Sequence, residues 1–126
     1  MDDLLRQSDF VVLATPLTPE TTNMITAKQL ALMKPTATLV NVSRGLLVNH
    51  DDLATALQNG TIRGAALDVT YPEPLPRDHP LLKLDNVIIT PHVASATEKT
   101  RLKMMQLAIE NLLAGLQGEK LPCGVN

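Results

Sequence analysis

The sequence of 126 residues predicts an α/β fold built on a parallel sheet. Four short segments are nearly continuous in apolar and β-branched residues, which is typical of strands buried on both faces. Two of the connections between them carry helical signals, and strand starts separated by 24 to 28 residues fit right-handed βαβ units. A long stretch with helical periodicity follows the last strand.

The expected strands cover residues 10–14, 38–42, 62–69 and 87–90, and the third is the weakest because it contains charged residues and a glycine. The connection between the last two strands holds YPEPLPRDHP, with four prolines in ten residues. Proline has no backbone N–H and clashes with a helical neighbour, so this segment cannot be helical in its middle. We expect an ordered loop over the sheet.

The first connection predicts a helix over about 27–34, because Thr26 and Gln29 have the spacing of a capping box. The second connection predicts another short helix, which Asn49 or Asp51 can cap and which Gly60 can end. The stretch 97–116 predicts a long helix that stops near Gly118. Its apolar stripe consists of Leu102, Met105, Ile109, Leu112, Leu113 and Leu116.

Composition excludes several classes of protein. Eleven basic against thirteen acidic residues give a formal charge of −2, and Phe10 and Tyr71 are the aromatic residues, so nucleic-acid binding is not expected. Cys123 is the single cysteine, which excludes an internal disulfide and a cysteine-based metal site. No apolar run has the roughly 18 residues of a membrane span, and the acidic start is unlike a signal peptide. We therefore expect a soluble, cytoplasmic protein without a metal.

The six glycines do not take the Gly-x-Gly-x-x-Gly spacing with which a dinucleotide-binding fold opens. The phosphate-binding half of such a fold is therefore expected to be absent from this chain.

Ligands of open parallel sheets bind beyond the carboxyl ends of the strands. Arg44, Asp68 and His92 each follow an apolar run and are separated by 24 residues, so we expect them on one edge. Glu73, in the proline-rich loop, can reach the same edge. Taken singly, each has a structural interpretation as well: Arg44 as a solvated charge, Asp68 as a partner of loop amides, Glu73 as an exposed carboxylate and His92 as a turn residue. His50 and His79 are interpreted as surface residues.

Together these four residues favour a particular chemistry. Arginine binds a carboxylate through two parallel hydrogen bonds, which orients a 2-keto or 2-hydroxy acid. A carboxylate beside histidine favours the imidazolium, which can give a proton to a carbonyl oxygen and take it back in reverse. With a hydride donor on the same edge, the set can reduce a 2-keto acid reversibly.

Several runs of the sequence resemble the C-terminal part of the D-2-hydroxyacid dehydrogenases, most closely those that reduce glyoxylate and hydroxypyruvate. The matching runs are LLRQSDFVVLATPLTPET, NVSRGLLVNHDDL, GAALDVTYPEPLP, HPLLKLDNVIITPH and SAT. The resemblance implies the C-terminal half of a Rossmann-like, doubly wound sheet. It places a partial nucleotide-binding domain at 1–96, and at 97–126 a terminal helix and tail that pack back toward a substrate domain.

The resemblance also assigns roles. It implies that Arg44 binds the substrate carboxylate, that His92 is the acid/base and that Glu73 is its partner, and it makes Ser95 a substrate-pocket residue. Ala94 stands where these reductases often have glycine. The implied contacts with NAD or NADP are Thr15, Pro16, Val42, Ser43, Arg44, Asp68, His92 and Ala94.

The resemblance implies that the activity, the reduction of small 2-keto acids, belongs to a longer protein. It also implies that this longer protein is a homodimer. This chain alone is expected to be inactive. Two alternatives stay open: a corepressor-like protein of the same fold that senses dinucleotides, and a non-catalytic fragment that folds with a partner chain.

Overall fold

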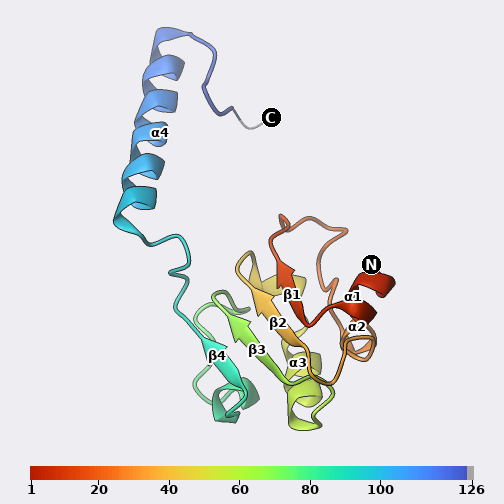
Figure 1. Ribbon diagram of the computed structural model, residues 1–126. Coiled ribbons are helices and arrows are strands. Elements are labelled where there is room, and N and C mark those ends of the chain that lie inside the picture. The colour runs from red at the N-terminus through yellow and green to blue at the C-terminus, as the bar shows by residue number, and fades with distance from the viewer. Residues whose placement is uncertain (125–126) are drawn as a thin grey trace. The chain divides into compact units, whose positions relative to one another are not determined.

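The computed structural model describes residues 1–124 and confirms the predicted α/β fold (Figure 1). Its sheet contains four strands, β1 (Phe10–Leu13), β2 (Thr38–Asn41), β3 (Gly64–Leu67) and β4 (Val87–Ile89). They lie in the order β1-β2-β3-β4, and each neighbouring pair is parallel. Every predicted strand is present, and each ends one or two residues earlier than the apolar run that predicted it.

The described helices are α1 (Asp2–Gln7), α2 (Ala27–Leu30), α3 (His50–Gln58) and α4 (Glu98–Gln117). The capping box of Thr26 and Gln29 is present at the start of α2. Of the two candidate caps for α3, Asn49 is the one used, because its side chain accepts a hydrogen bond from the Asp52 N–H. Gly60 follows α3 with φ 67°, a left-handed conformation that glycine adopts easily.

The first connection corrects one expectation, since α2 ends at Leu30 and not near Lys34. Beyond Leu30 the N–H of Leu32 and that of Met33 bond to carbonyls only three residues back, at 3.1 Å each. The chain after Leu30 is therefore wound with three-residue spacing, and Pro35 disfavours a helical conformation at Lys34, so the helix is not resumed. Three short elements were not predicted: α1 and the 3₁₀ helices Gly45–Leu47 and Pro80–Lys83.

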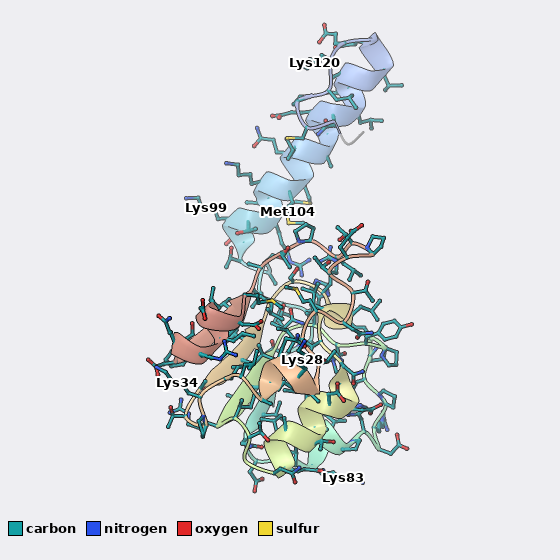
Figure 2. The ribbon with its side chains drawn as sticks, turned by 90° about the vertical axis from the view of Figure 1, so that its right-hand side faces the viewer. Lys28, Lys34, Lys83, Lys99, Met104 and Lys120 are labelled. Atoms are coloured by element: carbon teal, nitrogen blue, oxygen red, sulfur yellow. The ribbon has the colours of Figure 1, made fainter. Side chains whose placement is uncertain are left out.

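The core lies on one face of the sheet. Leu39 of β2 and Leu67 of β3 pack there in one cluster with Leu30 of α2 and Leu53 of α3, and all four are at most 2% exposed. The helices α2 and α3 pack side by side (Figure 2). His50, expected on the surface, is instead 8% exposed at the start of α3. His79 is half-buried.

The expectation that the strands are buried on both faces is wrong for this chain. Val12, Val40, Ala66 and Ile88 are neighbours across the four strands and form a row on the opposite face. Val12 is 57% exposed and Ile88 is 68% exposed. Apolar composition on both faces of a strand therefore did not mean that both faces are covered.

The chain divides into two units, Met1–His92 and a second that begins at Val93. The second unit contains α4, which stops at Gly118 as predicted. Its first turn is capped by the Thr97 hydroxyl, and Gly118 has φ 70°. The predicted apolar stripe of α4 is exposed within its own unit, where Leu102, Ile109 and Leu116 are all more than half exposed. Within residues 1–124, no helix has both the length and the apolar character that crossing a bilayer requires.

Candidate active site

The carboxyl edge of the sheet collects the residues that follow the strands. Because all four strands are parallel, the segments after them leave from the same edge. Arg44 follows β2, Asp68 follows β3 and His92 follows β4, as the even spacing predicted. Glu73 reaches this edge from the proline-rich loop. All four belong to the first unit.

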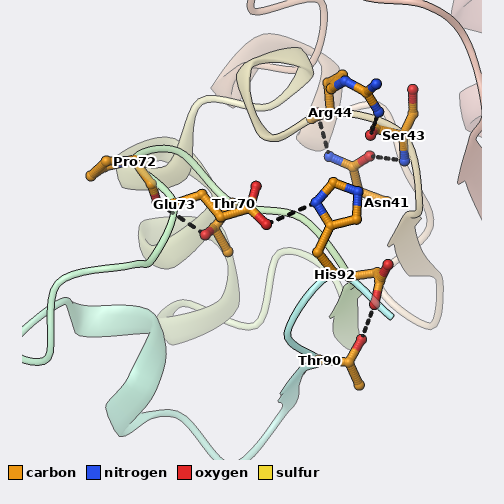
Figure 3. Close-up of polar contacts among 9 residues, drawn as sticks. Asn41, Ser43, Arg44, Thr70, Pro72, Glu73, Thr90 and His92 are labelled. Carbon is orange, nitrogen blue, oxygen red and sulfur yellow. Dashed lines mark hydrogen bonds and ion pairs between the residues drawn. The ribbon is translucent and has the colours of Figure 1, made fainter. Parts of the chain in front are cut away.

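His92 and Glu73 form the central contact of the site. The Nδ1 atom of His92 lies 2.9 Å from Oε1 of Glu73, and each side chain is nearly half exposed (Figure 3). A carboxylate can only accept a hydrogen bond, so Nδ1 carries the hydrogen atom and donates the bond. This bond fixes the orientation of the ring and leaves Nε2, on its other side, as the atom that can exchange a proton with a ligand.

The backbone of His92 adopts an uncommon conformation, with φ 53°. Left-handed backbone costs a non-glycine residue roughly 1–2 kcal/mol. The His92 N–H stabilises this conformation through a shared hydrogen bond to two carbonyl oxygens. Its nitrogen lies 2.9 Å from the Asp68 oxygen and 3.0 Å from the Thr90 oxygen. The turn after β4 therefore directs the imidazole back toward the loop of Glu73, and the carbonyl of Asp68 helps to fix it there.

Arg44 presents an exposed guanidinium at the same edge. One of its nitrogens, Nη1, donates to the carbonyl of Ser43 at 2.8 Å. No carboxylate forms an ion pair with Arg44 within residues 1–124. The remaining N–H groups of the guanidinium can therefore bind an incoming carboxylate.

Asp68 is only 6% exposed, although it is an acidic residue. Its Oδ1 atom accepts a hydrogen bond from the Thr90 hydroxyl at 2.6 Å, and its N–H donates to the Asn41 carbonyl at 2.9 Å. Asp68 thus ties β3 to its two neighbouring strands. Its expected contact with a nicotinamide cofactor stays a prediction.

The other predicted cofactor contacts have different settings. The carbonyl of Thr15 accepts a hydrogen bond from the Ser43 hydroxyl, which ties the end of β1 to the loop after β2. Pro16 and Val42 are exposed at the ends of β1 and β2. Ala94 and Ser95 belong to the second unit, and their expected roles stay predictions.

A cavity of about 440 Å³ lies beside Glu73 and shares Asp68 and Thr90 with the site. Sequence reasoning missed the contributions of Thr90, which bonds to Asp68, and of Asn41, which bonds to the loop of Arg44. A signal was available for Asn41, because it is a polar residue inside the apolar run TLVNV. In the described residues, no three His, Cys, Asp or Glu side chains are placed to hold a metal ion.

The arrangement joins a free cation, an imidazole and a carboxylate at the carboxyl edge of a parallel α/β sheet. The cation can hold an anionic substrate, while the His–Glu pair can donate or accept a proton. Fold and site together define a candidate acid–base active site for a small carboxylate.

Comparison with known proteins identifies the family. Residues 1–94 match the family model described as D-isomer specific 2-hydroxyacid dehydrogenase, NAD binding domain. The match covers well over half of the chain, so the chain belongs to this family.

Curated relatives have reductase names. The chain is 53% identical over 120 residues to the glyoxylate reductase/hydroxypyruvate reductase of Homo sapiens, a match that covers 95% of this chain and 37% of the human protein. It is 50% identical over 126 residues to the glyoxylate reductase of Thermofilum pendens, covering 100% of this chain and again 37% of the relative. The chain thus spans little more than a third of the length of these relatives.

Solved structures share the fold. The NADPH-dependent glyoxylate/hydroxypyruvate reductase of Sinorhizobium meliloti, in complex with NADP and malonate, aligns with a TM-score of 0.92 and 38% identity over 98% of this chain and 39% of its own. The NAD-complexed D-isomer specific 2-hydroxyacid dehydrogenase of Lactobacillus delbrueckii aligns with a TM-score of 0.89 and 39% identity over 98% of this chain and 42% of its own.

Proposed function

We propose that this chain is the catalytic part of an NAD(P)-dependent reductase that converts small 2-keto acids, such as glyoxylate or hydroxypyruvate, into 2-hydroxy acids, with the D configuration where the product is chiral. The observation that carries the proposal is the 2.9 Å contact between His92 and Glu73 on the same sheet edge as Arg44. The names of the relatives favour a reductase over a dinucleotide-sensing protein of the same fold.

In this mechanism Arg44 binds the substrate carboxylate through its guanidinium, which aligns the neighbouring keto group. His92, protonated on both nitrogens, gives the Nε2 proton to the carbonyl oxygen as that oxygen gains negative charge. Glu73 accepts from Nδ1 throughout, so it orients the ring and stabilises the imidazolium. In the reverse direction, neutral His92 removes the proton from the hydroxyl group.

The sheet edge fits part of a nicotinamide cofactor. Exposed Pro16 and Val42 offer an apolar surface at the ends of β1 and β2, and Thr15, Ser43 and Asp68 supply polar groups beside it. These residues would hold the nicotinamide end, with Ala94 as a further contact. When bound, a reduced nicotinamide supplies the hydride that the carbonyl carbon accepts.

The proposal assigns the activity to a protein longer than residues 1–126. Two observations support this assignment: the glycines of this chain do not have the Gly-x-Gly-x-x-Gly spacing, and the chain covers only 37% of the length of the human relative. Within that protein, residues 1–96 form part of the nucleotide-binding domain, and 97–126 form a helix and tail that pack toward a substrate domain containing the partners of Ser95. We expect a cytoplasmic homodimer.

The test joins this chain to the N-terminal portion of the human relative, in place of the segment that matches it. We expect the fusion protein to oxidise NADPH or NADH when hydroxypyruvate or glyoxylate is added, whereas the 126-residue chain alone gives a flat trace. The unaltered human protein serves as the positive control. A fusion protein that folds and binds NADPH but reduces neither acid would overturn the proposal.

A further inference from the structure

Asn41 is a buried polar residue at the last position of β2, with an exposed fraction of 0%. A buried amide is costly unless its hydrogen bonds are satisfied, so its partners show what it holds. The run TLVNV gives it apolar neighbours on both sides in the sequence.

Both ends of the Asn41 amide bond to the backbone around Arg44. Its Nδ2 donates to the Arg44 carbonyl at 2.9 Å, and its Oδ1 accepts from the Ser43 N–H at 3.1 Å (Figure 3). The Asn41 carbonyl in turn accepts from the Asp68 N–H at 2.9 Å. The side chain therefore connects the loop after β2 to the interior of the sheet.

The other side of the same loop is held by close packing. A Cβ atom at Gly45 would lie 2.0 Å from the carbonyl oxygen of Thr70, a backbone atom that cannot give way easily. Thr70 begins the segment that leads to Glu73, and its hydroxyl donates to the Pro72 carbonyl at 3.0 Å. The backbone of Arg44 is thus fixed on one side by Asn41 and, through its neighbour, on the other by the Glu73 loop.

We propose that Asn41 is a positioning residue for Arg44: its amide orders the loop so that the guanidinium meets the substrate carboxylate in one orientation. The inference rests on the proposed function of Arg44. A two-bond arginine–carboxylate contact depends on direction, so disorder of the loop weakens it even though the guanidinium is still present.

The informative variant is Asn41→Asp, which keeps the size of the side chain and an acceptor for Ser43 but loses the donor to the Arg44 carbonyl. Asn86→Asp is the matched control. The Nδ2 atom of Asn86 also donates to backbone carbonyls, those of Leu57 at 3.2 Å and Arg63 at 3.3 Å, and Asn86 lies just before β4, at the opposite edge of the sheet.

The first measurement uses the chain itself and needs no activity. We expect backbone order parameters from NMR relaxation near 0.85 at 43–45 in the unaltered chain, falling below about 0.6 in Asn41→Asp. In Asn86→Asp they should stay unchanged. Equal order in both variants would overturn the inference. If Asn41→Asp does not fold, the order parameter of the Asn41 side-chain amide in the unaltered chain is measured instead. We expect that order parameter to equal the backbone values at 43–45, and a mobile side-chain amide would overturn the inference.

The second measurement separates positioning from general stability in the fusion protein. Asn41→Asp should raise KM for the keto acid about twofold to tenfold, the range for one hydrogen bond between neutral groups, with a smaller change in kcat. Asn86→Asp should leave KM unchanged. In a double variant that also carries Arg44→Lys, Asn41→Asp should raise KM little further, because the effects of residues that act through one group are not additive. Full additivity of the two changes in KM would contradict the inference.

Inactivity of the unaltered fusion protein would count against the proposed function. The order parameters would still decide the role of Asn41.

Discussion

His50 is a buried imidazole in a cavity of about 380 Å³ that Tyr71 and His79 also line. Its Nδ1 lies 3.0 Å from the Val48 carbonyl and must donate, so neutral His50 keeps its lone pair on Nε2. Within the described residues that Nε2 is buried without a partner. Burial lowers the pKa of His50, and the nearby ring of His79 lowers it further, while the Val48 carbonyl and Asp51 act in the opposite direction.

This shift predicts a pH dependence of stability. In the unfolded chain His50 takes up a proton near the ordinary histidine pKa of about 6.5, whereas in the folded chain its lowered pKa keeps it neutral to lower pH. Protonation therefore favours the unfolded state, so the folded state keeps its full stability above about pH 6.5 and loses part of it as the pH falls. We expect the free energy of unfolding in urea to decrease from pH 7.5 toward pH 5. The decrease should be smaller in His50→Gln than in the unaltered chain. Identical pH profiles would show that His50 stays neutral or charged equally in both states.

Arg44 gives a second prediction at this scale. Arg44→Lys keeps the positive charge but replaces the planar fork with a single ammonium group, so carboxylate recognition should suffer. In the fusion protein we expect KM for hydroxypyruvate to rise about tenfold or more, with a smaller change in kcat. Lys34, which pairs with Asp9 at the other end of the sheet, offers a control as Lys34→Arg. An unchanged KM in Arg44→Lys would locate the carboxylate elsewhere.

The loop after β2 is the element on which the site depends most. Gly45 begins its 3₁₀ helix, and the Thr70 backbone leaves no room for a side chain there. Gly45→Ala should therefore destabilise the first unit by about 1–3 kcal/mol, the range for overpacking. Gly115→Ala, inside α4, meets only ordinary contact with Leu121 at 3.5 Å and should stabilise its helix by up to about 1 kcal/mol. Chemical unfolding monitored separately for each unit checks both, and an unaffected first unit in Gly45→Ala would contradict the packing described.

Local signals predicted the elements well where one motif decides the conformation. The capping box at Thr26, a cap at Asn49 or Asp51 and a helix stop near Gly118 depend on neighbours within a few residues. The structure has the capping box, uses Asn49 as the cap and stops α4 at Gly118. The end of α2 was missed because the apolar period continues past Leu30 to Met33, whereas the backbone there changes to three-residue hydrogen bonds, which the period does not reveal. The 3₁₀ helices have no comparable sequence signature.

Across the whole molecule, contacts between distant residues were predictable only in part. The even spacing of Arg44, Asp68 and His92 placed them on one edge, since parallel strands share their direction. The exact partners depend on side-chain geometry that spacing does not contain, as the bond from Thr90 to Asp68 shows. Likewise, apolar Val12 and Ile88 indicate the character of a sheet face, whereas its coverage depends on what packs against it.

The most direct test of the central claim follows the absorbance of reduced nicotinamide in the fusion protein, with hydroxypyruvate as substrate. We expect His92→Ala to lower kcat by about a hundredfold or more, because the proton donor is lost. Glu73→Gln should lower kcat less, because the donor stays and only the group that orients it is changed. His79→Ala, a histidine outside the site, should retain activity. Unchanged turnover in His92→Ala would show that His92 is not the proton donor.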